Sequence, residues 1–476
     1  MSTRRDFLKT MSLASAGMML GGGQWINAMT PGSSPEQKRA SADKVKIAFI
    51  GIGNRGAQII GDFERTQQID VVALCDVDLD GRQCQEVLAK FPKAKRFRDF
   101  RKMFDEAGNE FEAVAIATPD HSHFPISMLA LAEGKHVFVE KPLARTFYEA
   151  ELLMNAAKKR PNQVTQVGNQ GHSEANYFQF KAWTEAGIIK DVTAITAHMN
   201  NARRWHGWDA NIIKFPAGQQ LPKDMDWDTW LGVNPYHDYN KDYHQGQWRC
   251  WYDFGMGALG DWGAHILDTA HEFLELGLPY EVSMLYANGH NDYFFPYSST
   301  ILFRFPQRKG MPPVDVTWYD GVDNLPPLPP GYGESELGAD IPASNQGEYT
   351  KQKINPGKII YSKDLIFKGA SHGSTLSIIP KEKAEEMKDK LPKVPKSPSN
   401  HYVNFLRACQ GTEKTRSPFE INGVLSQVFC LGVIAQQLNA HLKFDPETKQ
   451  FINSPVANLL LRRGIPRKGW EEFYLL

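Results

Sequence analysis

Short apolar runs alternate with amphipathic stretches over residues 44–168 of the chain. Five runs have the length of a buried strand: 45–50, 69–75, 113–117, 136–139 and 164–167. The intervening stretches, such as 57–63, have the hydrophobic spacing of helices. Strands that alternate with helices form a parallel, doubly wound sheet, and ligands bind at the carboxyl ends of its strands. The pattern therefore predicts an α/β domain with a parallel sheet over 44–168.

The pattern changes in residues 169–476, which we expect to form a second α/β domain for substrate binding and oligomerisation. Its strand-like runs lie further apart, at 192–199, 281–287 and 298–305. Two stretches near the end read as helices that pack on the core, 401–409 and 422–441. The stretch 306–358 is rich in Pro and Gly and has little periodicity, so we interpret it as an inserted loop, either a lid or an oligomer arm.

Residues 1–43 have the pattern of an export signal followed by a linker. The pair Arg4-Arg5 precedes a short apolar segment, 11–20, which three glycines end. This arrangement is typical of a bacterial twin-arginine signal, and residues 26–28 offer a cleavage site. The alternative is an amphipathic helix of the mature fold. We expect export to the periplasm by a route that carries folded proteins, commonly with a cofactor already bound.

Composition argues against several classes of function. Lys plus Arg is 54 and Asp plus Glu is 54, so no net charge attracts the chain to nucleic acid or an anionic membrane. No apolar run reaches the ~18–20 residues of a membrane span, which argues against a stable membrane anchor. The five cysteines lack metal-site spacing and are best explained as buried free thiols. The length of 476 residues, at ~150 residues per domain, allows two to four domains.

A glycine-rich turn joins the first strand to the first helix. Gly51, Gly53 and Gly56 have the G-x-G-x-x-G spacing, with Asn54 and Arg55 between them. The first glycine allows a tight turn, the second admits a pyrophosphate, and the third lets helix and strand pack closely. The helix N-terminus adds unpaired N–H groups for the phosphates. We predict that these five residues bind a dinucleotide in a Rossmann domain; the alternative is a glycine-rich turn of another α/β unit.

An acidic residue follows the second strand at the spacing expected for a ribose contact. Asp76 lies twenty residues after Gly56, where a carboxylate binds the adenosine ribose and repels a 2′-phosphate. NAD is therefore favoured over NADP, although Arg82 downstream could weaken that preference. The later strands also end in polar stretches from which we predict cofactor contacts: Thr118, Pro119, His123, Glu140, Lys141, Asn169 and Gln170.

Three motifs together resemble the Gfo/Idh/MocA family, named for glucose-fructose oxidoreductase, inositol dehydrogenase and a rhizopine catabolism protein. They are the glycine turn 51–56, the triplet Glu140-Lys141-Pro142, and the segment 255–268 with the sequence Gly-Met-Gly-Ala-Leu-Gly-Asp-Trp-Gly-Ala-His-Ile-Leu-Asp. The resemblance covers roughly residues 44–440. It implies an N-terminal Rossmann domain and a C-terminal α/β domain whose open, mainly antiparallel sheet faces the nicotinamide. It also implies activity on sugars, cyclitols and related polyols.

The same motifs carry residues suited to acid–base chemistry at a hydroxyl group. Asp261 and His265 are i and i+4, so on a helix they share one face. A histidine beside a carboxylate can take a hydroxyl proton while hydride leaves the same carbon. Pro142 restricts the backbone of Lys141, whose ammonium could stabilise the developing alkoxide. The resemblance implies that Lys141, Asp261 and His265 are the catalytic residues, with Asp261 orienting His265.

Aromatic and histidine residues crowd the range 171–300. Flat rings can stack on the faces of sugar rings, although we expect most of these to be packing. Besides Lys141, Asp261 and His265, we predict substrate contacts from Trp205, Tyr243, His244 and Trp251, with Trp208 and Tyr252 as alternatives. Nothing in the spacing demands a metal, although His271 lies close enough in sequence to join Asp261 and His265 in one.

The leading prediction is an exported NAD-dependent oxidoreductase that oxidises a hydroxyl of a sugar or glycoside. Because no free NAD pool is expected outside the cytoplasm, the cofactor should be tightly bound and recycled in place. The second hypothesis is a redox-neutral glycoside hydrolase or lyase that passes through a keto-sugar. Family-109 hydrolases, which it would resemble, depart from Glu-Lys-Pro, whereas Lys141 is present here. A third is a non-catalytic sugar-binding protein. An open sheet with an uncovered face also predicts a homo-oligomer, a dimer or tetramer.

Overall fold

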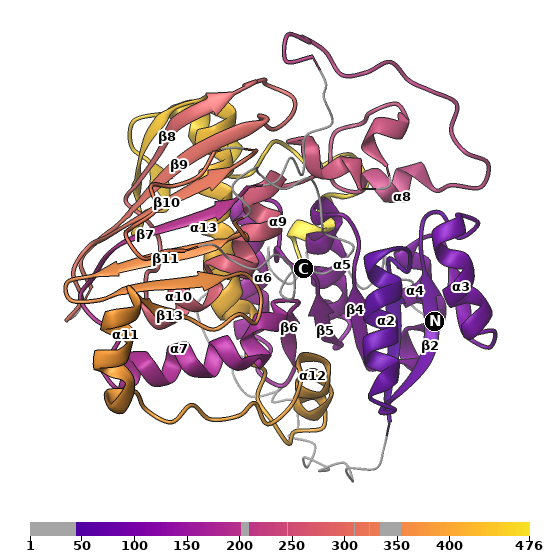
Figure 1. Cartoon of the computed structure of the whole chain (residues 1–476). Coiled ribbons are helices and arrows are strands. Elements are labelled where there is room, and N and C mark those ends of the chain that lie inside the picture. Colours follow the sequence, from indigo (N-terminus) through magenta and orange to yellow (C-terminus); the bar gives the residue numbers. More distant parts are fainter. Residues whose placement is uncertain (1–43, 201–208, 245, 309, 323, 334–353) are drawn as a thin grey trace, which may run out of the picture.

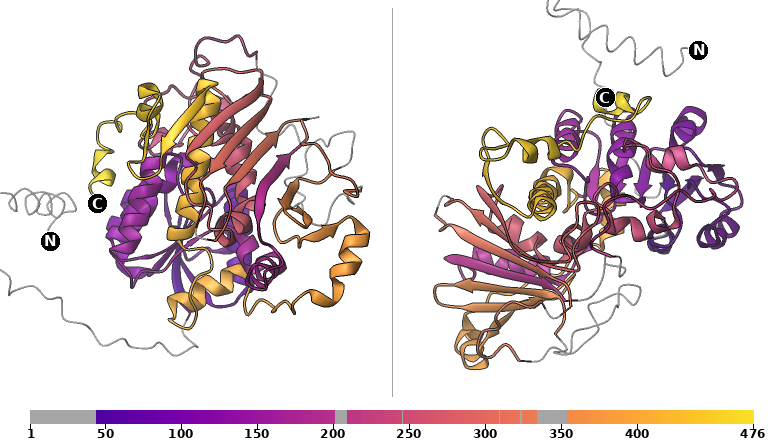
Figure 2. Two further views of the ribbon diagram at one scale, coloured as in Figure 1. Left: turned by 90° about the vertical axis from the view of Figure 1, so that its left-hand side faces the viewer. Right: turned by 90° about the horizontal axis from the view of Figure 1, so that it is seen from above.

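A computed structural model describes residues 44–200, 209–244, 246–308, 310–322, 324–333 and 354–476 (Figure 1). The predicted export signal and the predicted substrate residue Trp205, with its alternative Trp208, lie outside the described residues. Within these ranges the chain forms two sheets on opposite sides of the molecule, with helices between them (Figures 1 and 2).

The N-terminal sheet is parallel, in the order β3-β2-β1-β4-β5-β6. Its strands are β1 Val45–Ile50, β2 Ile69–Cys75, β3 Lys95–Phe97, β4 Ala113–Ile116, β5 His136–Val139 and β6 Thr165–Val167. Its helices are α2 Arg55–Arg65, α3 Arg82–Lys90, α4 Phe100–Ala107, α5 His123–Ala132 and α6 Phe147–Lys158. The five predicted strands are confirmed because a sheet covered on both faces keeps nearly continuous apolar runs. The pattern missed β3, a short strand with no such run.

The second sheet is mixed and mainly antiparallel, as predicted. Among the described residues its order is β13-β12-β11-β7-β10-β9-β8-β14-β15, and β7 with β10 is its parallel pair. Its strands are β7 Val192–Met199, β8 Glu281–Asn288, β9 Ser298–Phe305, β10 Val314–Asp320, β11 Gly357–Ser362, β12 Ile366–Ala370, β13 Ser377–Ile379, β14 His441–Asp445 and β15 Gln450–Phe451. The three predicted strands of this domain correspond to β7, β8 and β9.

The prediction of a loop over 306–358 is wrong at β10. This strand lies between β7 and β9, near the middle of the sheet. Val314, Val316 and Trp318 are buried and alternate with more exposed residues, which is the strand pattern. Prolines before the strand and a Pro-rich stretch after it obscured that short alternation. Residues 334–353 of the predicted loop lie outside the described residues.

Helices fill the space between the second sheet and the Rossmann sheet (Figure 2). These helices and the shorter ones of this half are α7 Ala175–Glu185, α8 Trp227–Leu231, α9 Gly257–Ile266, α10 Asp268–Phe273, α11 Lys381–Met387, α12 His401–Cys409, α13 Phe419–Leu438 and α14 Pro455–Leu460. Among the described residues, α13 is long and apolar enough to cross a membrane, contrary to the expectation from the sequence. Because 78% of its most apolar stretch is buried inside the protein, it serves as a core helix.

The C-terminal helices also complete the Rossmann domain. Helix α12 covers the face that carries α2, where Tyr402 packs edge-on against Phe63 with ring centroids 5.0 Å apart. Trp470 and Phe473, near the chain end, pack with the opposite face. The predicted helix 401–409 is therefore confirmed. The predicted helix 422–441 ends earlier, at Leu438, because Asn439 takes a left-handed conformation with φ 45°.

Candidate active site

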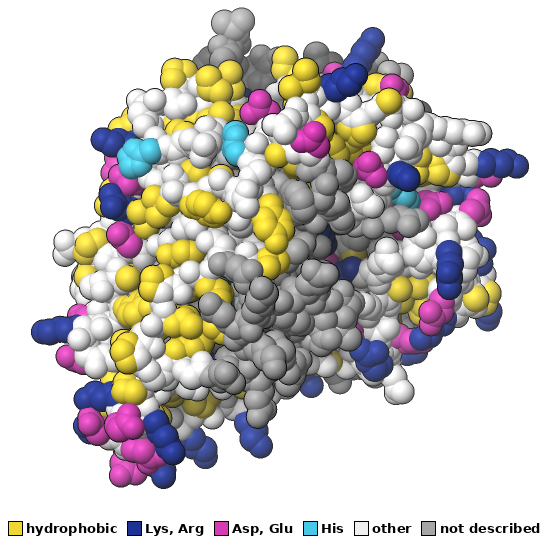
Figure 3. Space-filling view, turned by 45° about the horizontal axis from the view of Figure 1, so that its top comes forward, with side chains coloured by type: hydrophobic (Ala, Val, Ile, Leu, Met, Phe, Trp, Pro, Cys, Tyr) yellow, Lys and Arg dark blue, Asp and Glu magenta, His cyan; other side chains and the backbone are white. Residues whose placement is uncertain are grey.

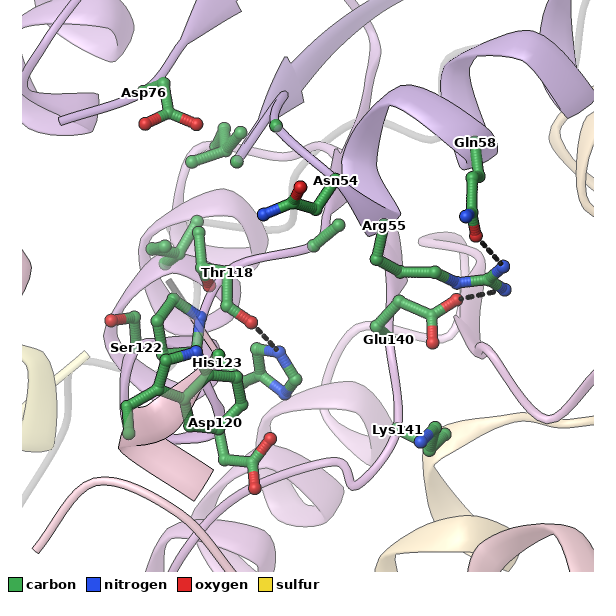
Figure 4. A pocket seen from close by; sticks show the side chains of 18 of the residues that line it. Asn54, Arg55, Gln58, Asp76, Thr118, Asp120, Ser122, His123, Glu140 and Lys141 are labelled. Carbon is green, nitrogen blue, oxygen red and sulfur yellow. Dashed lines mark hydrogen bonds and ion pairs between the residues drawn. The ribbon is translucent and has the colours of Figure 1, made fainter. Parts of the chain in front are cut away.

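A cleft of about 750 Å³ opens at the carboxyl ends of the Rossmann strands (Figure 4). Its walls come from the glycine turn, the ends of β2, β4 and β5, helix α9, the turn after β12, and the segment 229–249. Most predicted site residues lie on it: Gly51, Gly53, Asn54, Arg55, Asp76, Thr118, Pro119, His123, Glu140, Lys141, Gln170, His244, Asp261 and His265. The cleft thus gathers the cofactor motifs and the catalytic motif in one place.

The glycine turn leaves no room for side chains. Gly51 has φ +79°, and a Cβ there would lie 2.7 Å from the Ala117 carbonyl oxygen. A Cβ at Gly56 would lie 1.9 Å from the Gly51 carbonyl oxygen. Gly56 does not line the cleft; its role is the close packing of α2 on β1, as the motif requires. The backbone of this turn therefore approaches the cleft as a bare surface, which suits a pyrophosphate.

Two side chains at strand ends offer groups for the rest of a dinucleotide. The Asp76 carboxylate lies at the cleft and accepts hydrogen bonds from the backbone N–H groups of Ile52 (2.9 Å) and Asp78 (3.0 Å). It therefore also holds the glycine turn in place. At the end of β4, the hydroxyl of Thr118 is buried and has no hydrogen-bond partner among the described residues. A buried orphan hydroxyl at a cleft indicates a ligand or water contact.

The Glu140 carboxylate is anchored from two sides. It lies 3.1 Å from the Arg55 guanidinium (Figure 4). It also accepts a hydrogen bond of 3.1 Å from the Gln170 amide. The ion pair with Glu140 raises the pKa of Arg55 against the opposing effect of burial. The charge of Glu140 is thus paired with that of Arg55. The neighbouring Lys141 instead contacts the second domain.

His123 ties the loop after β4 to the loop after β5. Its Nε2 lies 3.0 Å from the Thr118 carbonyl oxygen (Figure 4). Its Nδ1 lies 2.7 Å from the Pro142 carbonyl oxygen. Burial lowers the pKa of His123, so the ring is neutral near pH 7 and donates at one of the two contacts. His123 therefore positions the cleft wall beside Thr118 and the Glu-Lys-Pro triplet.

Lys141 crosses from the Rossmann domain to helix α9. Its Nζ donates to the Asp261 carboxylate and to the Asp261 carbonyl oxygen, each at 2.7 Å. Both side chains are buried, at 10% and 6% exposure. Burial lowers the pKa of Lys141, and Asp261 opposes that effect. Asp261 thus binds Lys141, and the role of orienting His265 stays a prediction.

Arg249 is a charged residue of the cleft that the sequence did not reveal. Its guanidinium lies 3.3 Å from the Asp261 carboxylate and 3.4 Å from the Asp120 carboxylate. The guanidinium also stacks over Trp248 at 4.2 Å from the ring centroid. Asp261 therefore sits between two cations, Lys141 and Arg249, and the pKa of Arg249 is raised by these carboxylates despite burial. Arg249 lies within an aromatic stretch and belongs to no recognisable motif, so the sequence alone does not indicate its role.

His265 stacks on a second histidine, His372, from the turn after β12. The ring centroids are 4.0 Å apart and the planes differ by 16°. The backbone N–H of His372 donates to the His265 carbonyl oxygen at 2.9 Å. Burial is the main cause that lowers the pKa of both rings, to about 4 for His372. Both imidazoles are therefore neutral bases near pH 7.

Two predicted substrate residues do not reach the cleft. Tyr243 and Trp251 are each 1% exposed and pack on one another, with ring centroids 5.1 Å apart. Trp251 Nε1 donates to the Asp242 carbonyl oxygen, so even its polar edge is directed to the backbone. The prediction that they bind substrate is corrected, because a dense run of aromatic residues looks the same whether it packs or binds. Their neighbour His244 does line the cleft.

Asn169 is also corrected as a cofactor contact. It is buried, and its amide donates 2.9 Å to the Ala264 carbonyl oxygen in α9, next to His265. Asn169 therefore holds helix α9 against the end of β6 rather than lining the cleft. His271, considered as a metal ligand, instead donates from Nε2 to the Gly277 carbonyl oxygen at 2.9 Å. No group of three or more His, Cys, Asp and Glu in the described ranges could hold a metal.

A strap formed by residues 225–244 and 246–254 lies across the Rossmann domain beside the cleft (Figure 1). The Asp226 N–H donates to the Val77 carbonyl oxygen at 2.9 Å. The His121 ring lies 2.6 Å from the Trp230 carbonyl oxygen and 3.3 Å from that of Phe254. Trp230 and His244 of the strap line the cleft. The strap therefore encloses part of the cofactor region from the side of the second domain.

Known proteins match this chain over parts of its length. A "Glycosyl hydrolase family 109 protein" of Shewanella pealeana is 28% identical over 185 residues, 35% of this chain and 39% of that protein. An "Inositol 2-dehydrogenase/D-chiro-inositol 3-dehydrogenase" of Lactiplantibacillus plantarum is 28% identical over 200 residues, 41% of this chain and 55% of that protein. The match thus spans less than two thirds of either relative.

Solved structures share the fold. The WlbA dehydrogenase of Bordetella pertussis, in complex with NADH and UDP-GlcNAcA, superposes with a TM-score of 0.56 at 13% identity, over 86% of this chain and 99% of that one.

The oxidoreductase-family model with an NAD-binding Rossmann fold matches residues 45–168, and its C-terminal α/β domain matches 185–299 and 368–472. These two models cover most of the chain. Together with the glycine turn, the Glu-Lys-Pro triplet and the Asp261–His265 helix, they establish that this chain belongs to the Gfo/Idh/MocA family of NAD-binding oxidoreductases.

Proposed function

We propose that this protein oxidises a hydroxyl group of a sugar or glycoside with NAD as the hydride acceptor. The observation that carries the proposal is that one cleft holds the dinucleotide cradle, the Lys141–Asp261 pair and a neutral His265. A cofactor turn, a cation for a developing alkoxide and a base for a hydroxyl proton are the parts that such an oxidation requires. A relative with a polyol dehydrogenase name supports this substrate class.

The residues present fit NAD. The glycine turn would receive the pyrophosphate, and the start of α2 adds its N–H groups. Asp76 would accept from the ribose hydroxyls, and the orphan hydroxyl of Thr118 offers a further contact. A carboxylate at the ribose disfavours the 2′-phosphate of NADP, which is why we propose NAD. When bound, the nicotinamide ring supplies a hydride acceptor.

The chain's own residues move the proton and stabilise charge. His265 is neutral because its buried surroundings and the cations near it lower its pKa, so it can take the substrate hydroxyl proton. The Lys141 ammonium, held by Asp261, can donate to the reacting oxygen as it gains negative charge. Arg249, 3.3 Å from the Asp261 carboxylate, helps to hold that carboxylate in place, while burial and the charge of Arg249 lower the pKa of Lys141.

Tight cofactor binding and export form the second part of the proposal. The strap covers part of the cofactor region with buried side chains such as Trp230, which supports slow release of NAD. The Arg4-Arg5 signal supports export of a folded, cofactor-loaded protein. A bound cofactor would then need re-oxidation in place, by a second sugar or an external acceptor.

A homo-oligomer is the third part. Large apolar side chains are exposed on or beside β8, including Leu285 at 57% and Tyr286 at 48%. In the view of Figure 3, hydrophobic side chains gather on the half of the visible surface that lies over the second sheet. Exposed apolar clusters of this kind favour burial against another protein surface. A second copy of the chain is the partner we propose.

The alternative function is a redox-neutral glycoside cleavage through a transient keto-sugar. Relatives that carry the glycosyl hydrolase family 109 name favour it, and so does His372, a neutral histidine stacked on His265 in the cleft. The presence of Lys141 in the Glu-Lys-Pro triplet favours lasting oxidation instead.

The test begins with purified mature protein. Acid denaturation should release NAD into the supernatant in near-equimolar amount. Native protein mixed with a panel of free sugars, glucosides and galactosides should then develop the reduced-nicotinamide absorbance with at least one of them. Reduction that persists supports the dehydrogenase. Release of a nitrophenyl aglycone without lasting reduction supports the alternative. If the protein gives neither response, both proposed functions are excluded.

A further inference from the structure

A second neutral histidine, His372, stacks on His265 in the cleft, and a dehydrogenation needs only one base. Removing a hydroxyl proton while hydride leaves requires one base, and His265 suffices. From the geometry of the second ring we propose that His372 is a general base for the carbon next to the oxidised one, acting on the keto-sugar. This inference rests on the proposed oxidation, because that step creates the ketone.

Packing and a backbone hydrogen bond hold His372 beside His265. His372 lies in the turn between β12 and β13, more than a hundred residues after α9 in sequence, and its backbone N–H binds the His265 carbonyl oxygen at 2.9 Å. The two rings are nearly parallel, 4.0 Å apart between centroids. The Trp262 ring meets His372 edge-on, with centroids 5.5 Å apart. The histidine is therefore held in one orientation by packing and by backbone.

The ring nitrogens are distributed so that each histidine has one nitrogen for a ligand. Nδ1 of His372 lies 2.9 Å from the hydroxyl of the fully buried Ser371. Nδ1 of His265 is shielded from solvent and has no partner among the described residues. Both rings line the cleft, so Nε2 is the nitrogen of each that a substrate can reach.

Because the two rings stack with centroids 4.0 Å apart and both line the cleft, a sugar ring whose hydroxyl meets His265 also lies beside His372. In this proposal His265 takes the proton of the hydroxyl that becomes the ketone, and His372 acts at the adjacent carbon. Two stacked imidazoles cannot hydrogen-bond face to face, so His372 is not placed to relay the proton of His265.

Burial and nearby charges keep His372 unprotonated. Burial is the largest cause that lowers the pKa of His372, to about 4. Lys141 and Arg55 also disfavour the protonated forms of both rings, while Asp261 acts in the opposite direction. A neutral imidazole near pH 7 is ready to accept a proton.

The chemistry follows from the ketone. A C–H bond next to a carbonyl group is acidified, and His372 Nε2 takes that proton. The electron pair of the C–H bond forms a C=C bond, and the carbonyl π pair moves to the oxygen, where the Lys141 ammonium stabilises the enolate. The reverse step returns a proton from the imidazolium to carbon. Where the next carbon carries a leaving group, the enolate can expel it instead.

The test uses full-length protein with bound cofactor in D₂O. Its substrates are methyl glucopyranosides with a keto group at C2, C3 or C4, and NMR follows deuterium uptake at the carbon beside the ketone. The parent glucosides are assayed in parallel for cofactor reduction. We expect wild-type protein to catalyse uptake above the enzyme-free rate. His372→Phe should lower deuterium uptake at least tenfold, and by a clearly larger factor than it lowers cofactor reduction.

The controls separate a catalytic from a structural role. His290, which binds the Gln437 carbonyl oxygen, does not line the cleft, so His290→Phe should leave both rates unchanged. His372→Asn serves if the phenylalanine variant fails to fold. Equal uptake in wild type and both His372 variants, or an equal loss of uptake and cofactor reduction, overturns the role of His372. Cofactor reduction without any uptake overturns it too but leaves the proposed oxidation intact, whereas uptake without reduction by any glucoside refutes the oxidation.

Discussion

The ammonium of Lys141 donates to both the carboxylate and the carbonyl oxygen of Asp261, each at 2.7 Å. This one side chain thus links the Rossmann domain to helix α9 through two hydrogen bonds. Lys141 follows β5 of the Rossmann sheet, and Asp261 lies in α9 of the second domain. The alkoxide-stabilising cation that we propose is therefore also a structural tie, and its replacement should affect both turnover and stability.

Lys141→Met should abolish most of the activity without releasing the cofactor. Loss of a preorganised donor to a developing oxyanion costs ~10²–10³-fold in kcat. Breaking a buried ion pair costs ~3 kcal/mol of unfolding free energy, at the lower end of the usual range because Arg249 still neutralises Asp261. Steady-state kinetics and urea unfolding measure the two effects.

A double variant separates the two roles of Lys141. Lys141→Met with Asp261→Asn removes both charges, so stability should partly recover while kcat stays low. Arg304→Met, which breaks the ion pair with Glu281 on the second sheet, is the matched control and should change neither quantity much. Normal turnover in Lys141→Met would show that this cation is not part of the reaction.

Asp76→Ser should weaken the preference for NAD. The carboxylate is placed to bind the ribose and also accepts from the Ile52 N–H, so its loss should raise the Kd for NAD roughly tenfold, or about 1.4 kcal/mol. The affinity for NADP relative to NAD should rise because a repulsive charge is gone. Calorimetric titration of cofactor-stripped protein measures both. Asp70→Ser, on the same strand but exposed, should leave both constants unchanged.

Stability should fall steeply in mild acid. Burial lowers the pKa of several histidines, among them His121 and His401, to about 3, and His198 and His271, to about 4. The unfolded chain binds protons at these groups below about pH 6.5, whereas the folded state does not. The contribution of these neutral histidines to the free energy of unfolding is therefore fully present above pH 6.5. It is lost progressively as the pH falls toward the folded-state pKa values.

Each fully depressed histidine should cost about 1.4 kcal/mol per pH unit in that window. Urea unfolding at several pH values between 7.5 and 5 measures the slope. His198 binds the Asn355 carbonyl oxygen, a contact that Gln can keep, so His198→Gln should make the slope shallower by one proton. An unchanged slope in that variant would mean that His198 takes up a proton in the folded state.

Replacing Arg4-Arg5 by Lys-Lys should stop export. The twin-arginine route requires the arginine pair, so the variant should stay in the cytoplasm with its signal uncleaved. Because the route carries folded proteins, the retained variant should still contain NAD. Cell fractionation with an immunoblot checks the first point, and nucleotide release checks the second. Periplasmic protein in the same amount as wild type would rule out this signal.

Elements with a strong local pattern were predictable from the sequence. The strands β1 and β2 are buried on both faces, and α12 begins and ends where the pattern placed it. The glycine turn and the Glu-Lys-Pro triplet were recognisable because their chemistry requires fixed residue types at fixed spacing. In contrast, prolines on both sides obscured β10, a central strand of the second sheet.

Residues that reach the cleft from distant segments were not predictable. His372 and Arg249 carry no motif, and only tertiary packing brings them beside His265 and Asp261. Aromatic density likewise could not separate a packed Trp251 from a residue that meets substrate, because apolar rings are buried for stability as readily as for binding.

The central claim is that a substrate C–H hydrogen is transferred as hydride to the bound cofactor in the cleft that holds Lys141 and His265. Single-turnover mixing with a glycoside deuterated at its ring carbons, followed by mass spectrometry of the released nucleotide, tests it directly. The account predicts deuterium on the nicotinamide in wild-type protein and its loss in Lys141→Met, with equal nucleotide content in both. Undeuterated nucleotide from wild-type protein that has converted the glycoside would contradict it.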